Sequence, residues 1–198
     1  MLLLFKLSLL STALATVCSY NFLNEYDQPF DFRCPDGSVI NYIYSEHNDY
    51  FEDRRFEILC ASQTQTTECV NSGYVNAFDK PVNFICPRDK VMTGIESYHD
   101  NHYEDRRFNF QCCKIPDKKL SNCYMTEEVN TWDGPMTLQV PDGQVIQGAH
   151  SYHNDFYEDR IWKFQLCQLE DNQFLNNQLI KTRLKFTNTI NLDLETGK

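Results

Sequence analysis

The chain has 198 residues, which is enough for one domain with a hydrophobic core or for two small domains. Its 28 acidic and 18 basic side chains give a formal net charge of −10 at pH 7. This excess of negative charge argues against bulk nucleic-acid binding and against simple electrostatic capture of polyanions. We therefore predict no nucleic-acid partner.

Residues 1–19 are typical of a secretory signal peptide. Lys6 precedes an apolar run from Leu7 to Ala15, which is too short to span a membrane. The small residues allow cleavage after Ala15 or after Ser19, and we favour Ser19. No second long apolar run follows, so we predict a secreted, extracellular protein without a stable membrane span.

One phrase of the sequence occurs three times, in residues 23–60, 75–112 and 129–166. Its Glu-Asp-Arg triplets begin at residues 52, 104 and 158, so the repeats are 52 and 54 residues apart, with no gap inside the phrase. We predict one domain of three repeats of about 53 residues over residues 20–167. A C-terminal tail, residues 168–198, has no repeat partner.

Apolar and polar residues alternate inside each repeat, which is the pattern of half-buried strands. The first predicted strand places Phe30, Phe32 and Cys34 on one face, and a turn of the type PDGS follows it. The second predicted strand carries Gly94 and Gly148 in the later copies, where they suggest a bulge. The linkers between the repeats are polar and lack a helical period. We therefore predict an all-β fold.

Nine cysteines in an exported chain predict disulfides rather than thiolate chemistry. Repeats one and two each carry a cysteine after the first strand and another at the end of the last strand. Repeat three replaces both together, by Val140 and Leu166. Among the cysteines left after removal of Cys18, two further pairs are each 44 residues apart. The symmetry predicts the pairs Cys34–Cys60, Cys86–Cys112, Cys69–Cys113 and Cys123–Cys167.

The aligned loops SEHNDYFEDRRF, SYHDNHYEDRRF and SYHNDFYEDRIW share a serine, a histidine and the Glu-Asp-Arg triplet. Arg54 precedes the inward Phe56 by two residues, so it faces the core, whereas Arg55 faces outward. An inward arginine needs a carboxylate and backbone carbonyls, and the adjacent acids can supply the carboxylate. We predict a structural latch that pins the loop of each repeat, formed by Glu52, Asp53, Arg54, Glu104, Asp105, Arg106, Glu158, Asp159 and Arg160.

Metal binding is an alternative interpretation of the same loops, for example calcium bound by Asn48, Asp49, Glu52 and Asp53. The spacing fits no known ligand pattern, and the order of Asp and Asn changes between the copies. Three equivalent loops also suit a multivalent binder better than an enzyme with one pocket. We predict no metal, no cofactor and no catalytic residue. Aromatic rings at the loop tips are candidates for ligand contact, namely Tyr50, Tyr103 and Tyr157.

The segments EDRRFEILC, EDRRFNFQCC and EDRIWKFQLC, with the adjacent Cys112 and Cys113, resemble the dermatopontin family. That resemblance implies a secreted, non-enzymatic adhesion protein of the extracellular matrix. The expected partners are a glycosaminoglycan or proteoglycan, a cell-surface glycan or a matrix protein. Invertebrate relatives include haemagglutinins, cell-aggregation factors and a cytotoxin, so a secreted defence protein, either a lectin or a cytolysin, is the alternative function.

The CP-x-G opening of the repeat is similar to that of vitelline membrane outer layer protein, which is a three-fold β-prism. This similarity implies a three-fold pseudosymmetric, β-prism-like domain stabilised by disulfides. A β-trefoil is the alternative architecture.

Overall fold

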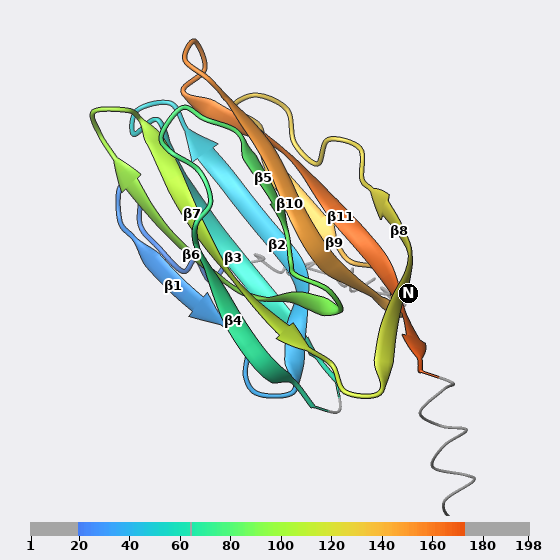
Figure 1. The fold of residues 1–198 in the computed structure, drawn as a ribbon. Coiled ribbons are helices and arrows are strands. Elements are labelled where there is room, and N and C mark those ends of the chain that lie inside the picture. The colour runs from blue at the N-terminus through green and yellow to red at the C-terminus, as the bar shows by residue number, and fades with distance from the viewer. Residues whose placement is uncertain (1–19, 64, 173–198) are drawn as a thin grey trace, which may run out of the picture.

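The computed structural model describes residues 20–63 and 65–172, and strands are the only regular elements of this part of the chain (Figure 1). The predicted all-β, disulfide-stabilised class is confirmed. Nothing among these residues forms a helix long and apolar enough to cross a membrane. The predicted signal peptide lies outside the described residues, as does the tail from residue 173 onward.

Each repeat contributes a short first strand and a long hairpin. The first strands are β1 (Phe30–Arg33), β5 (Val82–Ile85) and β9 (Met136–Gln139). The hairpins are β2 (Ser38–Asn48) with β3 (Asp53–Ser62), β6 (Lys90–Asp100) with β7 (Asp105–Lys114), and β10 (Gln144–Asn154) with β11 (Asp159–Asp171).

The first strand of each repeat pairs with the hairpin of another repeat. β1 pairs antiparallel with β6, β5 with β10, and β9 with β2, so the exchange closes from repeat three back to repeat one. The resulting sheets have the orders β1-β6-β7-β4, β5-β10-β11-β8 and β3-β2-β9. Every sheet therefore contains parts of two repeats. The prism-like three-fold symmetry itself stays a prediction.

The two polar linkers between the repeats form edge strands. β4 (Thr67–Tyr74) pairs with β7, and β8 (Lys118–Met125) pairs with β11. Most side chains of β4 are exposed, so this strand carries no alternation of apolar and polar residues. An edge strand of this kind is held by backbone hydrogen bonds to its neighbour, which a hydropathy pattern does not reveal.

The register of the long hairpins shifts at one position in each repeat, and glycine occupies the place next to the shift in two of them. The shift lies between Met92 and Gly94 and between Ile146 and Gly148. A Cβ atom on Gly94 would lie 2.7 Å from the backbone oxygen of Phe32 in the crossing strand β1. At the predicted bulge, the absence of a side chain on Gly94 therefore allows the exchanged strand to approach closely.

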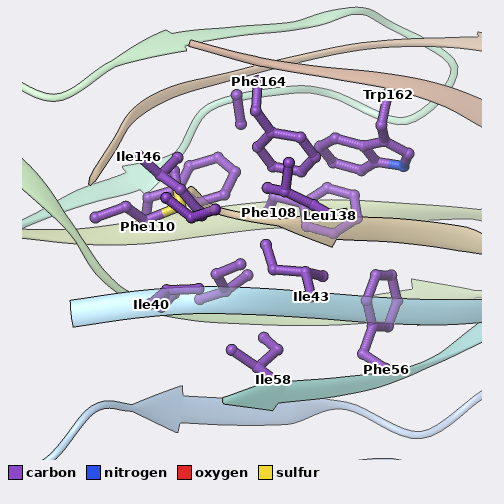
Figure 2. Close-up of a cluster of buried hydrophobic side chains, with 14 of the residues drawn as sticks. Ile40, Ile43, Phe56, Ile58, Phe108, Phe110, Leu138, Ile146, Trp162 and Phe164 are labelled. Carbon is purple, nitrogen blue, oxygen red and sulfur yellow. The ribbon is translucent and has the colours of Figure 1, made fainter. Parts of the chain in front are cut away.

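The larger of two hydrophobic clusters among the described residues lies between the three sheets, and all three repeats contribute to it (Figure 2). Phe56, Phe108 and Trp162, which occupy equivalent positions, are each 2–3% exposed. The ring centres of Phe108 and Trp162 lie 4.8 Å apart in an edge-to-face arrangement. Burial of such aromatic side chains stabilises the packing of the three sheets against one another.

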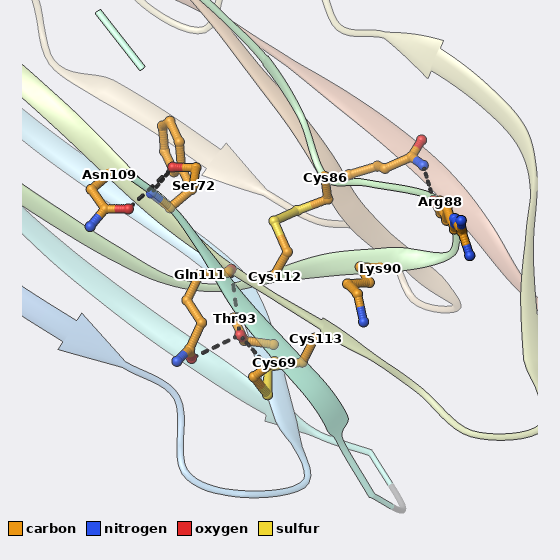
Figure 3. The surroundings of a disulfide bond; sticks show 12 residues. Cys69, Ser72, Cys86, Arg88, Lys90, Thr93, Asn109, Gln111, Cys112 and Cys113 are labelled. Carbon is orange, nitrogen blue, oxygen red and sulfur yellow. Dashed lines mark hydrogen bonds between the residues drawn. A yellow bond between two sulfur atoms is a disulfide. The ribbon is translucent and has the colours of Figure 1, made fainter. Parts of the chain in front are cut away.

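The structure contains the four disulfides that repeat symmetry predicts, Cys34–Cys60, Cys69–Cys113, Cys86–Cys112 and Cys123–Cys167. Cys86 and Cys112 are buried, and the adjacent Cys113 faces the opposite side, toward Cys69 and Thr93 (Figure 3). Val140 and Leu166, the apolar pair of repeat three, are buried at the equivalent positions.

Candidate functional site

Three buried arginines and three buried aspartates form a closed ring of ion pairs. Arg106 donates from Nε and Nη2 to the two carboxylate oxygens of Asp53 at 2.6 and 2.7 Å. Arg160 pairs with Asp105 in the same bidentate way, and Arg54 pairs with Asp159. All six residues are 3–4% exposed. We call them the charge ring.

The carboxylate of each pair comes from a different repeat than its arginine, which corrects part of the sequence interpretation. The arginines do face inward, but their partners are not the adjacent acids: Arg54 and Asp159 are 105 residues apart. The ring therefore joins the repeats to one another and does not pin each loop within its own repeat. Bidentate pairs of this kind fix both distance and orientation.

Backbone groups complete the hydrogen bonding of the ring. Asp53 also accepts a hydrogen bond from the backbone N–H of Asp27 at 2.8 Å. Arg106 donates a further hydrogen bond from Nη2 to the carbonyl of Gln28 at 3.0 Å. The other two pairs make the same contacts, with Asp79 and Lys80 and with Asp133 and Gly134. The ring thus also positions the opening segment of each repeat.

The glutamates of the triplets are not members of the ring. Glu52, Glu104 and Glu158 adopt left-handed backbone conformations, with φ of 45°, 44° and 43°. Together with the ring they line one cavity, whose wall also includes His47, His99 and three core rings. Desolvation raises the pKa of each glutamate, and neighbouring acids add to this effect while the adjacent histidine opposes it.

A buried asparagine is a structural residue that the sequence interpretation missed. Asn24 donates from Nδ2 to the carbonyl of Arg54 and accepts at Oδ1 from the backbone N–H of Phe56. Asn76 and Asn130 make the same two contacts in the other repeats. An asparagine occurs at the equivalent position of all three repeats, and this was the sequence signal that could have indicated its structural role.

The hairpin turns lie toward the same end of the molecule (Figure 1), consistent with the three glutamates lining one cavity. At the equivalent tip positions stand Tyr50, which is 87% exposed, His102, which is also exposed, and Phe156, which is 85% exposed. An Asx turn shapes each tip: Asn48 Oδ1, for example, accepts the backbone N–H of Tyr50 at 3.0 Å. Three exposed rings are thus presented together.

The three tyrosines predicted to contact a ligand do not occupy equivalent places. Tyr103 and Tyr157 stand one residue beyond the tip, and each has one ring face covered. Tyr103 stacks on Phe78 at 4.7 Å between ring centres, and Tyr157 stacks on Trp132 at 5.1 Å. Only Tyr50 of the three has a largely free ring.

Arg55, which strand parity places on the outward face, and its equivalents in the other repeats are partly or fully covered there by other side chains. Arg107 is half-buried, donates to the carbonyl of Asn76 at 2.8 Å, and lies 5.1 Å from the ring centre of Tyr74. Arg55 lies over Phe22 in the same way, and the third counterpart, Ile161, is buried. Aromatic side chains from the opening segments cover this side of the strands.

A surface groove combines aromatic and acidic side chains on the sheet that contains β1 and β6. Tyr74, Tyr98, Asp31 and Glu96 line it. Tyr74 donates its hydroxyl hydrogen to Glu96 at 2.8 Å, and desolvation, with Glu96 adding to it, raises the pKa of Tyr74 to about 12. Aromatic faces beside carboxylates suit stacking and hydrogen bonding with sugars.

Comparisons with known proteins agree on one family. The family model for Dermatopontin matches residues 24–171. Dermatopontin of Biomphalaria glabrata is 48% identical over 147 residues, which covers 74% of this chain and 99% of that protein. The hemagglutinin/amebocyte aggregation factor of Limulus polyphemus is 38% identical, over 76% of this chain and 88% of its own length.

Millepora cytotoxin-1 of Millepora dichotoma is 39% identical over 73% of this chain and 65% of its own length. No solved structure matches the chain.

Proposed function

Because the chain belongs to the dermatopontin family, a family of extracellular matrix proteins, we propose that it is a secreted, non-enzymatic adhesion protein that binds glycans or matrix proteins through its hairpin tips. The observation that carries this proposal is the presentation of Tyr50, His102 and Phe156 at one end of a disulfide-bonded scaffold. Tyr103 and Tyr157 support the tips from beneath and offer their ring edges.

Three weak sites on one scaffold are well suited to a repetitive surface. When several sites engage the same surface, avidity can exceed the affinity of a single site by about 10²–10⁴. The charge ring favours this mode, because it holds the bases of the three hairpins in a fixed relation and so reduces the entropy lost on binding.

A secreted defence protein is the second candidate. The relative named hemagglutinin/amebocyte aggregation factor, by its name, joins cells together, which multivalent tips would also do. An assay with erythrocytes distinguishes these functions. Agglutination that a free sugar inhibits indicates a lectin, and haemolysis indicates a cytolysin. Binding to immobilised matrix components without either effect indicates a matrix adhesion protein.

We predict that the triple variant Y50A/H102A/F156A loses nearly all binding to an immobilised glycan or matrix protein, whereas each single variant loses only part of it. The reason is that each tip supplies one of several simultaneous contacts. The measurement is surface binding of the secreted protein at low and at high salt. Stacking on a neutral sugar is insensitive to salt, whereas contact with a sulfated glycan weakens.

The matched control is L59A/I85A, which removes two exposed apolar side chains from strand surfaces away from the tips. It should bind like the wild type, and both variants should keep the wild-type melting temperature. A tip variant that folds and still binds fully would refute the proposed site. Loss of binding in Y74A/Y98A would then place the site in the aromatic groove of β6.

A further inference from the structure

Three clusters of imidazole and carboxylate groups lie between the repeats, next to the charge ring. Each joins a histidine of one hairpin to an aspartate from the opening segment of the preceding repeat in the cycle. His47 Nδ1 lies 3.7 Å from Asp133 Oδ1. The equivalent distances are 3.5 Å from His99 to Asp27 and 3.8 Å from His153 to Asp79.

A second carboxylate stands at two of these clusters. Asp49 Oδ1 lies 3.4 Å from His47 Nδ1, and Asp155 Oδ1 lies 3.3 Å from His153 Nδ1. Both aspartates are on the hairpin tips and are largely exposed. The ligand atoms of each such cluster all lie within 4.8 Å of one another. In repeat two, Asn101 stands at the tip position, and that cluster lacks the exposed acid.

The histidines are buried but poorly satisfied by the protein. Their side chains are 0–1% exposed. Neither ring nitrogen of His47 or His99 has a hydrogen-bond partner, whereas in His153 Nδ1 contacts Asp155 Oδ1 at 3.3 Å and only Nε2 has none. Oδ1 of Asp27 and Asp79 is also buried without a partner. Buried polar atoms normally find partners, so this repeated deficit points to a ligand that the atoms can share.

The spacing and the donor types suit a tetrahedral divalent cation. Two donors each 2.0–2.1 Å from zinc lie about 3.3–3.4 Å apart in a tetrahedron. In the clusters of His47 and His153, the imidazole nitrogen lies 3.3–3.8 Å from the two carboxylate oxygens. Calcium takes oxygen ligands, whereas imidazole selects zinc and similar first-row metals. On the far side of each imidazole, Nε2 lies 3.5–3.9 Å from Glu52, Glu104 or Glu158. A carboxylate there orients a metal-binding histidine.

We propose that the chain binds Zn²⁺, or a similar first-row divalent cation, at two inter-repeat sites. One is formed by His47, Asp49 and Asp133, and the other by His153, Asp155 and Asp79, with the imidazole bound through Nδ1. The cluster at His99 is a weaker third site, because Asn101 replaces the tip carboxylate. Each ion joins two repeats, so it stabilises the folded chain. This proposal is independent of the adhesion proposal, since its readouts are metal binding and thermal stability.

The test uses the secreted, oxidised chain after dialysis against a chelator, titrated with ZnCl₂ in a calorimeter and heated with and without the metal. We expect two tight sites per chain and a rise in melting temperature, because the ion binds the folded state more tightly than the unfolded chain. D49N/D155N should weaken both sites by more than about tenfold, since even outer-shell partners of a metal are worth 10- to 100-fold in affinity.

The matched control is D36N/D142N, which removes the same two charges from equivalent exposed turns at the opposite ends of β2 and β10. It should bind zinc like the wild type. The variant N101D should add a third tight site, because it completes the cluster at His99. Equal weakening in D49N/D155N and D36N/D142N would mean non-specific attraction of zinc to an acidic surface. That result, or the absence of zinc binding, overturns the proposal.

Discussion

Replacing Arg106 by methionine is expected to lower the free energy of unfolding by about 3–5 kcal/mol, because it leaves the carboxylate of Asp53 buried without its ion partner. Asp53 is 3% exposed and would keep only the backbone N–H of Asp27 as a donor. The carbonyl of Gln28 would lose its donor as well. Because the pair joins repeats one and two, the loss weakens their docking. Chemical denaturation with the disulfides intact measures it.

Two further variants show whether the ion pair itself is the cause. R106M/D53N should be less destabilised than the sum of R106M and D53N, since the amide oxygen of an asparagine can still accept from Asp27 while no charge is left buried. R88M, at an exposed arginine in the turn between β5 and β6, should change stability by no more than about 0.5 kcal/mol. A loss in R106M as small as that in R88M would contradict the role of the charge ring.

Removal of the buried disulfide Cys86–Cys112 is expected to cost about 3–4 kcal/mol in the variant C86V/C112L, while the fold is retained. The bond closes a loop with a sequence separation of 26, and its removal restores conformational entropy to the unfolded chain. Valine and leucine are the residues that fill the equivalent positions in repeat three, where Val140 and Leu166 are buried. The measurement is the denaturant midpoint of the variant against the wild type.

The comparison variant C86S/C112S should be less stable than C86V/C112L by about 1–3 kcal/mol for each hydroxyl left buried without a partner. The two variants lose the same cross-link, so the difference between them reports on the core alone. The burial of Cys86 and Cys112 indicates that water does not reach these positions. Equal stability of the two variants would contradict this, because it would mean that the serine hydroxyl groups find hydrogen-bond partners there.

Much of the fold followed from the sequence because its signals are local and occur three times. Alternation of apolar and polar residues marks the long strands, and the glycines at Gly94 and Gly148 mark their bulges. The strand parity that placed Arg54 two residues before Phe56 gave the correct inward direction for this arginine. The paired replacement of two cysteines in repeat three indicated which cysteines belong together, since a buried thiol without its partner is avoided.

The partners across repeats were decided only by the tertiary structure. Arg54 meets Asp159 at a separation of 105 residues, and His47 meets Asp133, because the first strand of each repeat pairs with another hairpin. Every repeat carries the same acidic residues. The sequence therefore does not show whether an arginine pairs with the adjacent carboxylate or with the equivalent carboxylate of another repeat. Local alternation of side chains determines which face of a strand is buried. Which repeat supplies the opposing charge depends on long-range strand pairing, and that pairing leaves no local signal.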